Sequence, residues 1–172
     1  MDTHISGDCT AEAFREASME LDAAYTLFAK ACGLSASEYW TLLLVSQGVR
    51  TQGEINVRLS ISKQTLNSAV MALKRKGLVR LEPLEQNQRV KRLFLTNMGV
   101  HFVEAYIVQM RQLEKQAWQS MDPGEQSSLT KLTKKFSALL TAAMKQIQDS
   151  DSNEKKDSDL WQVQEIKTSS NM

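Results

Sequence analysis

Apolar residues recur every three or four positions in three long stretches of the chain, at residues 14–32, 98–121 and 123–147. This spacing places them on one face of an α-helix, so each stretch is predicted to be helical. Asp122 and Pro123 give the last helix an N-cap and a proline at its first position. Because the three apolar faces exceed what one small domain can cover, we expect a second copy of the chain to bury the remainder.

Shorter helices are predicted in the middle of the chain from the residues at their starts. Ser35–Glu38 and Thr51–Glu54 are both capping boxes, in which a hydroxyl residue is followed three positions later by a glutamate. Ser62 is the next N-cap and opens a helix over residues 63–76, which Gly77 ends. The middle of the chain thus begins with three consecutive helices.

Two short segments after these helices have the pattern of β-strands. Residues 78–81 alternate apolar and polar positions, and residues 90–95 form the returning strand. Pro83 is expected to end the first strand, and residues 84–89 are polar turn material. The order of three helices and a basic hairpin predicts a mainly α fold with a small β-hairpin wing, a winged helix-turn-helix.

The helix over residues 63–76 can be divided into a buried and an exposed side, because successive residues turn by about 100°. The predicted buried stripe is Leu66, Ala69, Val70 and Leu73. The opposite side carries Gln64, Ser68 and Arg75 near its centre, with Asn67, Met71 and Lys74 toward one edge. Amides, hydroxyls and cations suit hydrogen bonding to base edges and phosphates, but they are equally common on a helix that meets only solvent.

The formal net charge of +1 conceals a strong segregation of charge along the chain. Residues 50–92 hold ten basic and three acidic side chains, a balance of +7, whereas the remainder holds eleven basic and seventeen acidic ones, a balance of −6. A basic segment with acidic flanks is typical of a surface that meets a polyanion. A solvated basic surface without a partner is the alternative.

Several classes of protein are disfavoured by what the sequence lacks. No apolar run approaches the roughly 18 residues that cross a bilayer, and the first residues lack a secretory pattern. Cys9 and Cys32 have no CxxC spacing, and His4 and His101 are too few for a metal site. The missing span, the missing secretory pattern and the cysteine usage predict a cytoplasmic protein. Because no Gly-rich phosphate loop, metal-ligand spacing or nucleophile with an evident base is present, we also expect that it is not an enzyme and holds no cofactor or metal.

The order and spacing of the predicted elements resemble the MarR family of bacterial transcriptional regulators. The resemblance covers residues 14–148 and is carried by residues 34–40, 51–55, 62–79 and 95–99. It implies an N-terminal helix of the dimerisation region in residues 1–33, a DNA-binding winged helix-turn-helix in residues 34–97 and C-terminal dimerisation helices in residues 98–148.

Residues 149–172 follow this region, and their six acidic and three basic side chains predict a disordered polar tail. A transient helix is the alternative. It would dock through the few apolar residues of the tail, which are Leu160, Trp161, Val163 and Ile166.

The resemblance implies a homodimer that binds pseudo-palindromic double-stranded DNA, with one helix of each copy in a major groove and the wing in a minor groove. The DNA-binding residues that it implies, together with the exposed helix side, are Ser62, Lys63, Gln64, Thr65, Asn67, Ser68, Arg75, Arg89 and Lys91. Arg89 matches the arginine of the family's Asp-x-Arg wing motif, but Asn87 stands in place of the aspartate. An amide cannot form a bidentate ion pair, so Arg89 is expected to be less rigidly aimed.

Many members of the family are repressors that a small aromatic acid releases, or sensors that act through cysteine oxidation. Tyr25, Tyr39, Trp40 and Tyr106 are candidates to line an effector pocket, although aromatic residues at these spacings also suit a core. The reactive cysteine of the sensors corresponds to Glu16, and Cys32 is interpreted as a small buried residue. We expect a repressor, with a protein–protein adaptor that no longer binds DNA as the alternative.

Overall fold

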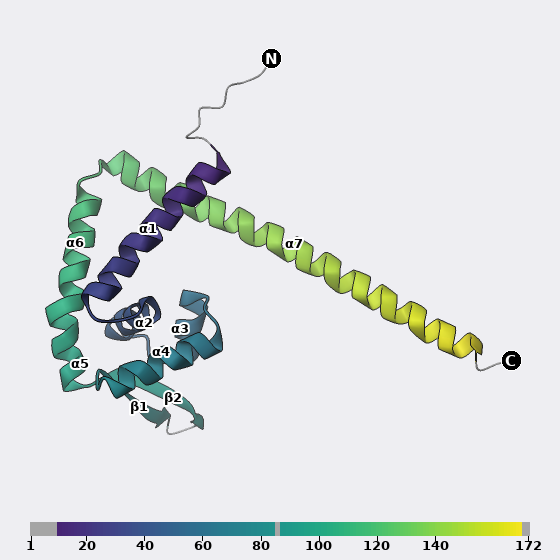
Figure 1. Ribbon diagram of the computed structural model, residues 1–172, viewed down its shortest axis with the longest axis horizontal. Helices are drawn as coiled ribbons and strands as arrows, with labels where there is room; N and C mark the ends of the chain where they lie inside the picture. The colour runs from purple at the N-terminus through teal and green to yellow at the C-terminus, as the bar shows by residue number, and fades with distance from the viewer. Residues whose placement is uncertain (1–9, 85–86, 170–172) are drawn as a thin grey trace, which may run out of the picture. The chain divides into compact units, whose positions relative to one another are not determined.

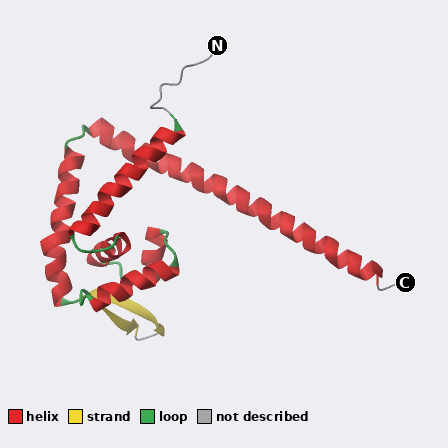
Figure 2. Cartoon of the chain, viewed as in Figure 1, coloured by secondary structure: helices red, strands yellow, loops and turns green. Residues whose placement is uncertain are grey.

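The structure is a computed structural model that describes the backbone of residues 10–84 and 87–169 and the side chains of residues 10–83 and 91–148. The chain is mainly helical with one two-stranded hairpin, as the sequence predicted (Figures 1 and 2). The elements are α1 (Ala11–Ala31), α2 (Ala36–Ser46), α3 (Gln52–Leu59), α4 (Lys63–Arg75), β1 (Val79–Leu84), β2 (Asn87–Leu95), α5 (Asn97–Phe102), the π-helical turn η2 (Val103–Ile107), α6 (Val108–Gln119) and α7 (Pro123–Ser169).

The predicted N-caps are confirmed. Ser35 and Glu38 form a capping box at the start of α2, with the Ser35 N–H donating to Glu38 Oε2 at 2.7 Å. Thr51 and Glu54 repeat this arrangement at α3. At α4 the N-cap is Ser62, whose hydroxyl accepts the Thr65 N–H at 3.0 Å. Each cap satisfies backbone N–H groups that the helix itself leaves unpaired.

The hairpin is longer than the sequence indicated. Strands β1 and β2 pair antiparallel from Val79 opposite Leu95 to Pro83 opposite Lys91, with an irregularity after Pro83. Pro83 was expected to end the first strand, and that prediction is wrong. A bridge from Thr51 to Arg92 occupies the other side of β2, so β1 is the edge strand, where a residue without an N–H is tolerated.

The buried core confirms the side of α4 that was predicted to face inward. Leu66, Ala69, Val70 and Leu73 are at most 3% exposed. Leu66 and Val70 pack with residues of α2, α3 and β2, whereas Leu73 joins a second cluster that includes residues of α1, α2 and η2. The apolar stripe therefore attaches α4 to the other elements of the winged helix and leaves its opposite side in solvent.

The helix predicted over residues 98–121 is interrupted by a π-helical turn, η2. A π-turn takes one residue more than an α-turn, so it shifts the phase of the side chains that follow it. Ile107, the last residue of this turn, is 1% exposed and lies in the core with residues of α1 and α2.

The chain divides into two compact units, Met1–Lys115 and Gln116–Met172. The second unit contains α7, which continues to Ser169 where the sequence analysis expected a disordered tail. Residues 149–169 contain neither proline nor glycine, the two residues that most strongly disfavour a helix interior. Residues 170–172 of the expected tail lie outside the described part. No helix in the described part of the chain is long and apolar enough to cross a membrane.

Candidate nucleic-acid interface

The predicted contact residues of α4 all lie on its solvent side. Every one of Ser62, Lys63, Gln64, Thr65, Asn67, Ser68 and Arg75 is exposed. The hydroxyls of Ser62 and Thr65 are 2.8 Å apart and hydrogen bond to each other, so these two residues hold the first turn of the helix together. Among the described residues, the side chains of Lys63, Gln64 and Asn67 have no hydrogen-bond partner, which leaves their donors and acceptors available for a ligand.

The hairpin lies beside α4 and adds further cations to the same lobe (Figure 1). Lys91 is exposed and lies opposite Pro83 in the register of the two strands. Arg92 is also exposed. Arg89 belongs to β2, but its side chain lies outside the described residues, so the predicted position of its guanidinium remains a prediction.

The basic segment contains two kinds of cation. Three of its ten basic side chains bind groups of the protein itself and thus serve the fold: Arg50, Lys76 and Arg80. Six others are exposed: Arg58, Lys63, Lys74, Arg75, Lys91 and Arg92. The segment therefore presents a positive surface, but one with fewer available cations than the sequence count suggests.

A cluster at the base of the wing was not predicted from the sequence. The guanidinium carbons of Arg50 and Arg80 each lie 5.3 Å from the centre of the Phe94 ring. Arg50 also donates to the Val45 carbonyl at 2.7 Å, and Arg80 donates to the Leu95 carbonyl at 2.6 Å. These contacts join β1, β2 and the segment before α3 through cation–π and hydrogen-bond interactions. Strand alternation alone does not reveal which cations an aromatic ring will meet.

Three of the four aromatic effector candidates come together. The ring centres of Tyr25 and Trp40 are 5.1 Å apart, and those of Tyr39 and Trp40 are 5.3 Å apart. The Tyr25 hydroxyl donates to Glu114 Oε1 at 2.6 Å. Burial and then the Glu114 carboxylate raise the pKa of Tyr25 to about 12.

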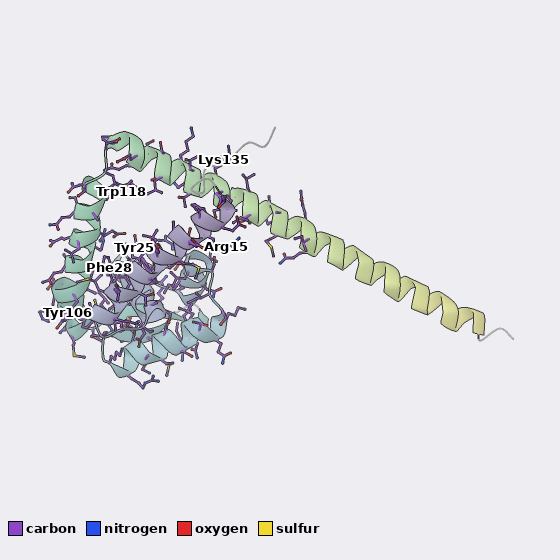
Figure 3. The ribbon with its side chains drawn as sticks, turned by 45° about the horizontal axis from the view of Figure 1, so that its top comes forward. Arg15, Tyr25, Phe28, Tyr106, Trp118 and Lys135 are labelled. Carbon is purple, nitrogen blue, oxygen red and sulfur yellow. The ribbon has the colours of Figure 1, made fainter. Side chains whose placement is uncertain are left out.

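Tyr106, the fourth candidate, stacks on Phe102 at 4.8 Å. Figure 3 shows Tyr25 and Phe28 on α1 and Tyr106 on the helix that contains the π-turn. Tyr25, Tyr39 and Trp40 therefore form one aromatic cluster. Tyr106 has no described ring contact with this cluster.

Cys32 is 7% exposed in the core cluster that contains Tyr39, and burial raises the pKa of its thiol. A raised pKa disfavours the reactive thiolate, in agreement with the interpretation of Cys32 as a packing residue. Cys9 lies outside the described residues. Within the described part, no group of three or more metal-ligating side chains comes together.

Comparison with known proteins finds a family model that is similar to the region of this site. A model of the MarR family matches residues 33–89, which run from the loop after α1 into β2 of the hairpin. No curated protein matches the chain.

Solved structures share the fold over most of their length. A Staphylococcus aureus MepR–DNA complex is 24% identical with a TM-score of 0.62, covering 75% of this chain and 96% of that one. The regulator BldR from Sulfolobus solfataricus is 20% identical with a TM-score of 0.62, covering 77% and 98%. A probable transcriptional regulator from Pseudomonas aeruginosa is 19% identical with a TM-score of 0.61, covering 75% and 97%. Residues 33–89 therefore match a MarR-family model in sequence, and the chain has the winged helix-turn-helix fold of these solved structures.

Proposed function

We propose that this protein is a DNA-binding transcription regulator of the MarR type that acts as a homodimer on a pseudo-palindromic operator. The observation that carries the proposal is the solvent side of α4, where two amides and several cations stand together on a helix whose other side is fully buried. The major groove of B-DNA, about 12 Å wide, admits one α-helix. The MepR structure, a complex with DNA on the same fold, supports this assignment.

Residues of α4 divide into two roles in this proposal. Gln64 and Asn67 read base edges, because a carboxamide can pair with the N6 and N7 atoms of adenine. Lys63, Lys74 and Arg75 bind phosphates, which supplies affinity without sequence information. Arg89 enters the minor groove from the wing, with Lys91 on the adjacent backbone.

The homodimer is proposed from apolar residues that a single copy leaves in solvent. In α1, Leu21 is 57% and Leu27 is 63% exposed. In α7 the exposed apolar residues recur at helical spacing: Leu129, Leu132, Leu139, Leu140, Met144 and Ile147. Soluble proteins rarely expose so continuous an apolar face, and symmetric association of two copies is the commonest way to cover one.

We further propose that the protein represses transcription and that a small aromatic effector releases it. Tyr25, Tyr39 and Trp40 are the candidate contacts for the effector, since their rings meet at the junction of α1 and α2. Titration of the protein with aromatic acids, monitored through tryptophan fluorescence and compared with Trp40→Phe, tests this part. Saturable quenching that the variant loses supports it, and equal responses contradict it.

Selection of bound fragments from the source genome tests the main proposal and yields the operator. With that operator, Arg89→Ala should weaken binding and lower the slope of log affinity against log salt by about one. Gln64→Ala should relax the base preference at one position of each half-site. Lys115→Ala, which removes an exposed cation of α6, is the control and should leave the salt slope unchanged. Binding independent of salt would favour the adaptor alternative.

A further inference from the structure

A lysine at the end of α4 binds the junction between α1 and α2. Lys76 is the C-cap residue of α4, and its ammonium donates to the Gly33 carbonyl at 3.0 Å and to Glu38 Oε2 at 3.1 Å. The same Glu38 oxygen accepts the Ser35 N–H at 2.7 Å. One side chain thus connects α4 with the loop that leaves α1 and with the first turn of α2.

The geometry of this contact is restricted because Glu38 is buried. Its side chain is 8% exposed, whereas that of Lys76 is 40% exposed. A buried carboxylate is stable only when its charge is paired and its oxygens accept hydrogen bonds. The carbonyl of Gly33 is also held in place, because the residue has a φ of +67° and its N–H donates to Lys30. Lys76 is therefore tied to fixed acceptors.

The apolar stripe of α4 by itself does not fix the direction of the helix to a few degrees. Packing of side-chain ridges into grooves sets the angle between two helices only to within about 15–20° from one protein to another, so the contacts that a particular protein makes decide the angle within that range. With 13 residues, α4 is about 20 Å long at about 1.5 Å per residue. A rotation of about 10° at its C-terminal end would displace its N-terminal end by about 3.4 Å, the rise of one base pair.

We infer that Lys76 is a positioning residue that sets the direction of α4 relative to α1 through Gly33 and Glu38. The inference rests on the proposed function. If α1 belongs to the dimer interface and α4 reads DNA, this contact fixes the distance between the two α4 helices. It therefore fixes the half-site spacing that the dimer accepts. Lys76 contacts protein acceptors, so in this role it contributes no phosphate contact.

The test measures affinity for the selected operator and for duplexes whose half-sites are moved by one and two base pairs in each direction. Lys76→Met keeps the length of the side chain but loses both contacts. We expect its preference for the best spacing to fall by about tenfold, which corresponds to one charge-assisted hydrogen bond. Its salt slope should equal that of the wild type. Lys76→Arg, which retains the charge and the donors, should restore most of the preference.

Lys74→Met is the matched control, because Lys74 is an exposed cation on the same helix. It should lower the affinity for every spacing equally and reduce the salt slope. Glu38→Gln provides a second variant if Lys76→Met does not fold, since its amide oxygen can still accept the Ser35 N–H.

Two results would overturn the inference: a spacing profile in Lys76→Met that matches the wild type, or a uniform loss with a lower salt slope. A wild-type protein that selects no duplex would refute the proposed function and this inference together. A wild-type protein that binds, alongside a Lys76→Met variant with an unchanged profile, would refute only the inference.

Discussion

Gly99 lies where α5 begins, and replacing it by alanine tests how closely the hairpin is joined to the helices that follow. Its N–H donates to the Thr96 hydroxyl at 2.9 Å, and the residue is buried. A β-carbon at this position would lie 1.9 Å from the Leu78 carbonyl oxygen and 2.9 Å from its carbon. Both atoms are backbone, so no flexible side chain can move aside.

Two opposing effects determine the magnitude. Alanine is favoured over glycine inside a helix by about 1 kcal/mol. Overpacking a close contact costs about 1–3 kcal/mol, and a backbone obstacle places Gly99→Ala at the upper end of that range. We expect a net loss of about 2 kcal/mol in the free energy of unfolding, or a melting temperature lower by about 4–8 °C for a chain of this length.

Gly53→Ala is the matched control, because it makes the same chemical change in α3. The nearest atom to its new β-carbon is the Thr51 hydroxyl oxygen, at 4.0 Å. This variant should gain about 0.5–1 kcal/mol. Urea and thermal unfolding at one protein concentration would measure both variants, since association makes the midpoint depend on concentration. A Gly99→Ala protein that is as stable as Gly53→Ala would contradict the expected clash with the Leu78 backbone.

Three further predictions concern buried polar groups. Thr41 is fully buried and its hydroxyl oxygen has no hydrogen-bond partner. Thr41→Val should therefore raise the free energy of unfolding, measured by urea titration, by about 1 kcal/mol, and a lower free energy of unfolding would contradict this. Burial raises the pKa of Glu38, but hydrogen bonds from Ser35 and Lys76 outweigh it and hold the pKa below its ordinary value of 4.5. The stabilisation is therefore present above that value and lost as the pH falls through the folded-state pKa, so Glu38→Gln should lose less stability than the wild type between about pH 5 and pH 3. Burial is the largest cause that raises the pKa of Tyr25 and Tyr39 to about 12, so in an ultraviolet titration the native protein should ionise two fewer tyrosines by about pH 11 than the unfolded one.

Features that depend on neighbouring residues could be predicted from the sequence. The caps at Ser35, Thr51 and Ser62 could be predicted because a capping side chain reaches only the N–H groups two or three residues ahead. The buried stripe of α4 could be predicted because helical geometry fixes which residues share a side. The exposed residues of α4, and with them most of the candidate interface, followed from the same geometry.

Contacts between distant residues could not be predicted and are known from the fold. Lys76 and Glu38 are 38 residues apart, and Tyr25 and Glu114 are 89 residues apart. No periodicity in the sequence predicts either pair. Pro83 fits in a strand because the fold places that strand at the edge of the sheet. The fold likewise decides which cations of the basic segment bind groups of the protein and which are exposed to solvent. Local geometry is set by covalent and hydrogen bonds between residues that are close in the sequence, whereas contacts between distant residues depend on how the elements pack.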